Sequence, residues 1–214
     1  MANTHVYSRR EEWANALTHG IGAALSIAAL VVLVVSASLH GTAWHIVSFS
    51  IYGSAMLLLY VASTLVHSFP EGKAKNRFEA MDHSCIYLFI AGTYTPILFT
   101  VIQGALGWTL FGIVWGMALC GVVFKAFFAS RFLYTSTLIY IAMGWLILFA
   151  WKPLVANMAS GGVGLLLAGG ILYTLGTVFY VWRSFPYHHA VWHLFVLGGS
   201  IAHFFAILLY LLPW

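Results

Sequence analysis

Seven long runs of apolar residues divide the chain, and short polar segments separate them. A helix needs about 20 apolar residues to cross the hydrocarbon core of a bilayer. Strands of a membrane barrel would instead alternate polar and apolar residues over about ten positions. The runs are continuous, so they predict transmembrane helices. The expected spans are 20–39, 45–67, 82–102, 107–128, 133–151, 161–182 and 190–212.

The positive residues predict which way the chain crosses the membrane, because Lys and Arg gather in cytoplasmic segments. Seven spans place the N-terminus on the same side as the segments after the second, fourth and sixth spans. That side carries eight Lys and Arg residues, whereas the other side carries Lys152 alone. We therefore expect an all-α integral membrane protein, a seven-transmembrane helix bundle with a cytoplasmic N-terminus and an external C-terminus. No linker or repeat divides it, so residues 1–214 are predicted to form a single domain.

The composition supports a membrane protein and excludes other classes. Hydrophobic residues make up 62% of the chain and charged residues only 7%, whereas a soluble domain carries about 25% charged residues. Disorder would require low hydrophobicity. The net charge of +4 is spread thinly along the chain, which favours an anionic membrane surface over nucleic acid as a partner. Glycines are frequent in the sixth run and indicate close helix packing there.

Ionisable and polar side chains gather at the cytoplasmic end of the predicted bundle. Such groups are costly to place in a membrane, so each is a functional candidate. They come from the segment before the first span and from the ends of the second, third and seventh spans. The candidates are Glu12, Asn15, His19, His67, Asp82, His189 and His193.

The spacing of these residues points to a metal site. His189 and His193 are four residues apart and share one helix face, which allows two imidazoles to bind one metal. His67 supplies a third imidazole from another helix, with Ser63 one turn deeper. Three histidines and one open position suit catalytic zinc, although other divalent metals also bind such a site. Asp82 is placed to hydrogen-bond a water on the metal or to orient a ligand histidine.

Each of these residues also has a structural interpretation. His189 and His193 would form a solvated face at a helix start, and His67 would be a hydrogen-bonded core histidine. Asp82 would cap the third span, since Asp favours helix N-termini. These alternatives stay open on spacing alone.

The other histidines are not expected to bind the same metal. His203 lies ten residues beyond the pair, or about 15 Å along a helix. His40 and His45 fall in a predicted outer loop. His83 and His188 neighbour the candidates and are expected to point elsewhere, as interfacial side chains.

These segments together resemble the hemolysin III proteins of bacteria, a branch of the progestin and adipoQ receptor (PAQR) superfamily. The stretch from Glu12 to His19 matches the family's E-x-x-N-x-x-x-H, and Ser63 to His67 matches its S-x-x-x-H. MDHSCIYLFIAGTYTP matches the third span that carries the family's aspartate, and HHAVWHLFVLGGSIAHF matches the H-x-x-x-H of the last span. The four motifs occur in the expected order over nearly the whole chain.

The resemblance implies a seven-helix bundle with its N-terminus inside and zinc held by His67, His189 and His193. It implies that Asp82 lies beside a water in the fourth coordination position of the zinc and that Ser63 supports Asp82. Asp82 and Ser63 are then the expected catalytic residues. It also implies a multi-pass protein of the bacterial cytoplasmic (inner) membrane that acts in membrane-lipid homeostasis. Membrane lipids are then the expected partners.

Three functions of different classes remain open. The first is a zinc-dependent intramembrane hydrolase of lipid amide or ester bonds, because the family is similar to alkaline ceramidases in its Ser, Asp and His pattern. Its lipid substrate would enter sideways from the bilayer. The second is a non-enzymatic sensor or regulator of membrane state with structural zinc. A channel or haemolytic pore is disfavoured, since the ionisable residues cluster at one end.

Overall fold

The computed structural model describes residues 7–129 and 131–213, and this part of the chain is helical and contains no strand. The predicted all-α class is therefore confirmed for the described residues. The long helices are α1 (Arg9–His40), α2 (Ala43–Ser68), α3 (Lys73–Thr100), α4 (Ala105–Phe128), α7 (Ser160–Val181) and α8 (His188–Tyr210). Between α4 and α7 lie α5 (Leu133–Gly144), the 3₁₀ helix η1 (Trp145–Ala150) and α6 (Trp151–Asn157).

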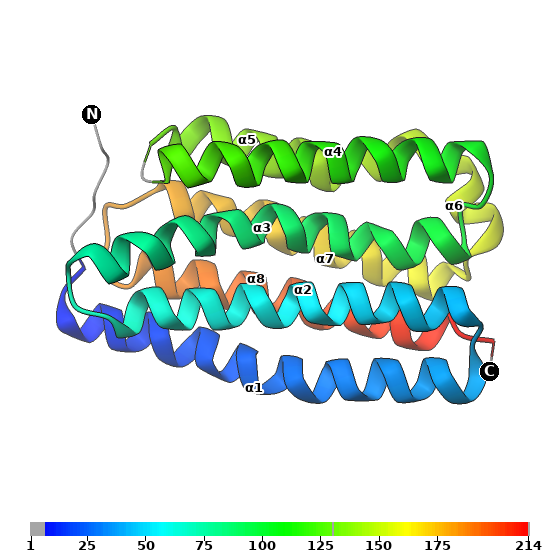
Figure 1. Cartoon of the computed structure of the whole chain (residues 1–214), viewed down its shortest axis with the longest axis horizontal. Coiled ribbons are helices and arrows are strands. Elements are labelled where there is room, and N and C mark those ends of the chain that lie inside the picture. The colour runs from blue at the N-terminus through cyan, green and yellow to red at the C-terminus, as the bar shows by residue number, and fades with distance from the viewer. Residues whose placement is uncertain (1–6, 130, 214) are drawn as a thin grey trace.

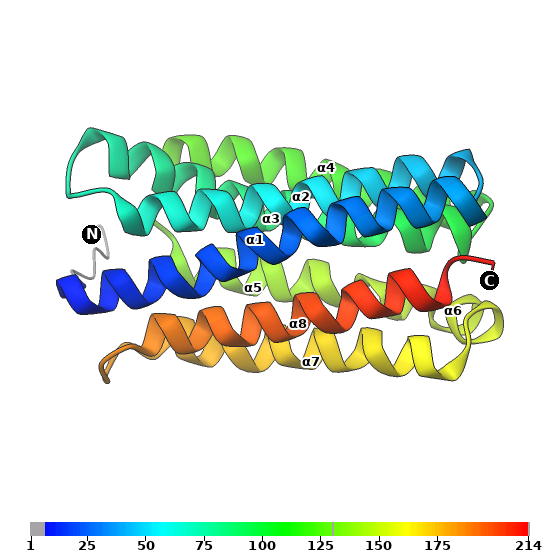
Figure 2. The ribbon, with the colours of Figure 1, turned by 90° about the horizontal axis from the view of Figure 1, so that it is seen from below.

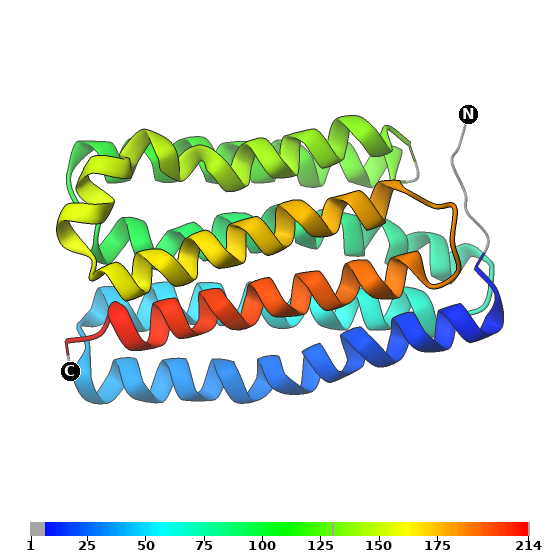
Figure 3. The same ribbon diagram turned by 180° about the vertical axis from the view of Figure 1, so that it is seen from behind.

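The helices run back and forth along one long axis (Figure 1). Helix α1 packs between α2 and α8, α3 packs against α2 and α4, and α7 packs against α8 (Figure 2). Helices α4 and α5 lie along the edge of the bundle opposite α1 (Figure 3). One end of the bundle, here called the proximal end, is where α1, α3, α5 and α8 begin and α2, α4 and α7 end.

Six helical segments of the described chain are long and apolar enough to cross a membrane. They are α1, α2, α4, the segment Leu133–Asn157, α7 and α8. Large apolar side chains such as Leu39 and Phe127 are more than two-thirds exposed, as expected of a surface that faces lipid rather than water. Helix α3, which corresponds to the third predicted span, is long enough but less apolar, since it carries Glu79, Asp82 and His83. The structure thus supports a membrane-embedded helical bundle.

Two boundaries differ from the prediction. The polar stretch before residue 82 does not form a loop throughout, because α3 already begins at Lys73. The predicted span 133–151 is not one α-helix, and helix α6 continues to Asn157 where a loop was expected. The hydroxyl of Tyr94 explains the interruption, since it accepts from the Ile147 N–H and donates to the Gly144 carbonyl, each at 2.8 Å. A side chain from α3 thereby replaces α-helical bonds at the start of η1.

Local sequence explains where two of the helices begin. Ser8 and Glu11 form a reciprocal capping box, which starts α1 well before its apolar run and carries the polar motif residues on a helix. Gly104 precedes α4 with a φ of 83°, a conformation that glycine adopts without strain.

Glycines of α7 bring this helix close to α8, as predicted. A Cβ at Gly169 would collide with the ring of His203, and a Cβ at Gly176 would lie 2.8 Å from the ring of Trp192. Gly164 has no neighbour within 4 Å, so the glycines are not equivalent. This close packing holds α8 in register with the rest of the bundle.

Candidate metal centre

Three histidines from two helices meet at the proximal end. His67 lies in the last turn of α2, and His189 and His193 lie in the first two turns of α8. One ring nitrogen of each lies within 4.8 Å of the other two, and all three side chains are buried. The chain therefore brings together the three residues that sequence spacing singled out.

The donor atoms of this histidine cluster fit a metal ion. His67 Nδ1 lies 2.6 Å from a carboxylate oxygen of Glu12, and His67 Nε2 is buried without a hydrogen-bond partner among the described residues. His189 Nδ1 is likewise buried and unpartnered there. Buried polar atoms are nearly always paired, so these nitrogens are suited to a ligand. Tetrahedral zinc with Zn–N bonds of about 2.0–2.1 Å would require the rings to close inwards slightly.

Polar groups of helix α1 contact the ring of His193. His193 Nδ1 lies 3.0 Å from the hydroxyl of Thr18 and 3.2 Å from the backbone carbonyl of Asn15. The ring of His19 stacks on that of His193, with centroids 3.4 Å apart. Asn15 and His19 are buried at this level, as the motif pattern indicated, but neither belongs to the metal-binding group. Sequence reasoning missed Thr18, because nothing in its spacing marks a contact with the last helix.

Asp82 and Ser63 lie beside the cluster and outside the metal-binding group. The hydroxyl of Ser63 lies near enough to the carboxyl group of Asp82 to interact with it. Both line one cavity together with His189 and His193. Capping is not the role of Asp82, because α3 begins nine residues earlier, at Lys73.

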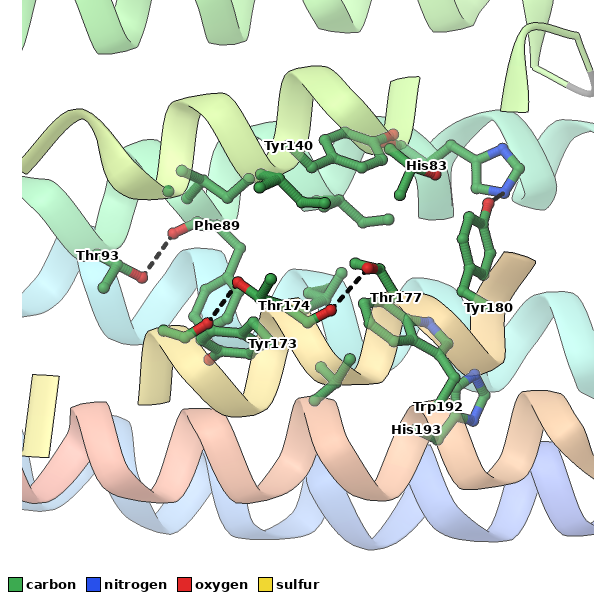
Figure 4. A pocket seen from close by; sticks show the side chains of 18 of the residues that line it. His83, Phe89, Thr93, Tyr140, Tyr173, Thr174, Thr177, Tyr180, Trp192 and His193 are labelled. Atoms are coloured by element: carbon green, nitrogen blue, oxygen red, sulfur yellow. Dashed lines mark hydrogen bonds between the residues drawn. The ribbon is translucent and has the colours of Figure 1, made fainter. Parts of the chain in front are cut away.

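An apolar cavity of about 130 Å³ extends from the histidine cluster between α3, α5, α7 and α8. Figure 4 shows His193, Tyr180 and His83 at one end of it and Thr93 and Tyr173 at the other. Most of the surface of its wall is apolar, although many of the lining side chains are Tyr, Thr, Trp and His. A cavity with one polar end and a long apolar body is suited to an amphipathic ligand.

A second cavity, of about 140 Å³ and much more polar, opens at the proximal end. It shares Asp82, His83, Tyr180 and His189 with the apolar cavity. The histidine cluster therefore lies where the two cavities meet. We refer to them below as the apolar cavity and the polar cavity.

Charged side chains line the polar cavity from several helices. Partial burial lowers the pKa of Lys75. Hydrogen bonds to Glu12 and Glu71 have the larger effect, so the pKa of Lys75 is raised overall. Burial raises the pKa of Glu79, and the positive charge of Lys125 opposes that rise. Both Lys75 and Glu79 precede the predicted membrane span of α3.

The remaining histidines of residues 7–129 and 131–213 lie outside the cluster. His83 Nδ1 bonds the Ala129 carbonyl at 2.9 Å, and His188 Nδ1 bonds the Phe179 carbonyl at 3.0 Å. Both point away from the cluster, as expected, but His188 is fully buried, so its interpretation as an interfacial side chain is wrong. His45 is not in a loop either, because it lies in the first turn of α2.

Comparison with known proteins connects these features to a family. A family model described as "Haemolysin-III related" matches residues 7–204. The chain is 56% identical to Hemolysin-3 of Bacillus cereus over 95% of this chain and 93% of the relative. It is 55% identical to the Hemolysin-3 homolog of Bacillus subtilis over 96% of each. It is also 31% identical to the human monocyte to macrophage differentiation factor, over 94% of this chain and 84% of that protein.

Proposed function

The chain belongs to the haemolysin-III related family of multi-pass membrane proteins, and from this premise we propose that it is a zinc-dependent intramembrane hydrolase of lipid amide or ester bonds. Its role would be in membrane-lipid homeostasis. The observation that carries the proposal is the histidine cluster, whose donor atoms lie within 4.8 Å of one another at the mouth of the apolar cavity.

In this proposal the chain crosses the bacterial cytoplasmic membrane seven times, with α3 as the third span. The N-terminus is cytoplasmic and the C-terminus is external. The distribution of Lys and Arg, eight against one, supports this orientation. The proximal end then faces the cytoplasm, so the histidine cluster lies near the inner surface of the bilayer.

His67, His189 and His193 would hold the zinc ion. The unpartnered nitrogens of His67 and His189 and the Glu12 carboxylate beside His67 support this assignment, because ligand histidines are usually oriented by such a carboxylate. Bound zinc supplies Lewis acidity and activates water at neutral pH. Helix α1 would keep the ring of His193 in place through Thr18 and the Asn15 carbonyl.

Asp82 would act as the general base. Hydrolysis adds water to the carbonyl carbon and breaks its bond to nitrogen or oxygen. Asp82 would accept a proton from water and return it to the departing amine or alcohol. Ser63 would orient the carboxylate through a hydrogen bond. The apolar cavity would hold the acyl chain, since most of the surface of its wall is apolar.

A second candidate function is a non-enzymatic sensor of membrane state with structural zinc. The observation that favours it is that the cluster joins the end of α2 to the start of α8, with α1 hydrogen-bonded to His193. Zinc at this point would tie three helices together. A change in membrane state that moved them apart would then be coupled to zinc binding.

Fatty-acid release separates the two functions. Zinc-loaded protein reconstituted in vesicles of mixed bacterial lipids would be compared with Asp82→Ala, and the zinc content of each would be measured. The hydrolase proposal expects free fatty acid from the native protein and a fall of about 10²–10⁴-fold in the variant, with zinc retained. No release from zinc-loaded native protein, together with normal cellular function of Asp82→Ala, would favour the sensor.

A further inference from the structure

The polar cavity adjoins the proposed reaction centre but has no part in the proposed chemistry. Asp82 and His189 line both cavities, so a molecule whose chain fills the apolar cavity would place its polar part in the other. The residues that line the polar cavity therefore indicate which polar group the lipid carries.

Lys125 is the most unusual residue of the polar cavity. It lies in the last turn of α4, and only 2% of its surface is exposed. Its ammonium donates two long hydrogen bonds, each 3.3 Å, to the backbone carbonyls of Ala129 and Arg131. No carboxylate of the described residues lies within ion-pair distance of it. A buried ammonium without an anionic partner is costly, so the site is suited to an external anion.

The remaining charges of the cavity are divided between two sides. On the side formed by α1 and the start of α3, Glu12 and Glu71 both pair with Lys75, so these two carboxylates are engaged by Lys75 and not by Lys125. On the other side, Arg131 and Arg183 line the cavity together with Lys125. Figure 1 shows that the end of α4, the start of α5 and the end of α7 gather at the proximal end.

Two more acidic residues line the polar cavity, Asp82 and Glu79, and neither forms an ion pair with Lys125. The closer of the two to the start of α3 is Glu79. Burial raises the pKa of its carboxyl group, which favours the neutral form. Lys125 and Arg131 form no ion pair with a carboxylate of the described residues. A phosphate group matches them better than a single carboxylate does, because it offers more acceptor oxygens and up to two charges for Lys and Arg donors.

We propose that the polar cavity binds the phosphate of an acyl lipid whose chain occupies the apolar cavity, with Lys125 as the central contact and Arg131 beside it. The substrate class is then phosphate-bearing lipids and not neutral lipids of the same chain length. The assignment as a substrate rests on the proposed hydrolase function. The binding of phosphate does not, so the two can fail separately.

Equilibrium binding to the full-length protein in detergent tests this proposal. The probes are a short-chain phosphatidic acid, the diacylglycerol with the same chains, and inorganic phosphate. We expect the phosphatidic acid to bind about tenfold more tightly than the diacylglycerol. This preference is expected both in zinc-loaded and in chelator-treated protein, so absence of zinc or of turnover would not affect the readout.

Variants connect the preference to the cavity. Lys125→Gln should remove most of the preference for phosphate while leaving diacylglycerol binding unchanged. Lys152→Gln, an exposed lysine at the other end of the bundle, should have no effect. If Lys125→Gln does not fold, Arg131→Gln at an exposed position provides the same comparison. Equal binding of the two lipids to the native protein, or inorganic phosphate binding as tightly as the phosphatidic acid, would overturn the proposal.

Discussion

The carboxylate of Glu12 lies 2.6 Å from Nδ1 of His67, although 55 residues separate them in the chain. This contact engages one ring nitrogen and leaves Nε2 for a metal. A carboxylate in this position fixes the ring of a ligand histidine and increases its basicity. Glu12 is itself held by an ion pair with Lys75. The first motif of the chain thus acts on the ligand that the second motif supplies.

Glu12→Gln should therefore weaken zinc binding by about 10–100-fold, measured by titration against a chelator of known affinity. The amide keeps the size of the side chain but loses the charge. Glu71→Gln is the matched control, because Glu71 also contacts Lys75 but has no recorded contact with a histidine. Equal zinc affinity of native protein and Glu12→Gln would contradict the role assigned to this carboxylate.

The zinc content should depend on the histidines at the start of α8 and not on His203 further along the same helix. Elemental analysis of purified native protein is expected to give about one zinc per chain, the content of a single three-histidine site. His193→Ala should contain little zinc, since it removes a ligand. His203→Ala should keep the native content, because His203 is bonded to the Leu166 carbonyl and lies outside the cluster. Loss of zinc in both variants, or in neither, would contradict the assigned ligands.

The sequence predicted which three histidines would come together, because two of them lie at regular helical spacing and a motif marks the third. His189 and His193 share a helix face through local geometry alone, and a motif marks His67. The contacts between helices could not be predicted in this way. The hydrogen bond from Thr18 to His193 spans 175 residues and depends on how α1 and α8 are rotated against each other. No local pattern encodes that rotation.

The same reasoning explains the errors in the fold. The predicted span 133–151 reads as one helix because its apolar run is continuous. The break at Gly144 depends on the hydroxyl of Tyr94, which reaches it from α3. Lys125 was counted only as a charge that sets orientation, although an ionisable residue next to an apolar run is itself a signal of a functional site.

Removing zinc should lower the thermal stability of the native protein. A ligand that binds only the folded state stabilises it by about 2.7 kcal/mol at a concentration one hundred times its Kd. Addition of a strong chelator should therefore lower Tm in detergent. His189→Ala should begin with the lower Tm and show little further change with chelator. A chelator effect of equal size in both proteins would mean that the metal binds elsewhere.

Packing of α7 against α8 should control the site from a distance, because α8 carries two of the three proposed ligands. In Gly169→Ala the new methyl group would collide with the ring of His203, and overpacking of this kind costs about 1–3 kcal/mol. In Gly164→Ala nothing lies within 4 Å, so the change should be neutral or stabilising by about 0.4–1 kcal/mol through the unfolded chain. Thermal unfolding in detergent distinguishes them. Equal stabilisation of the two variants would indicate that the higher helix propensity of alanine, and not close approach to α8, determines the effect.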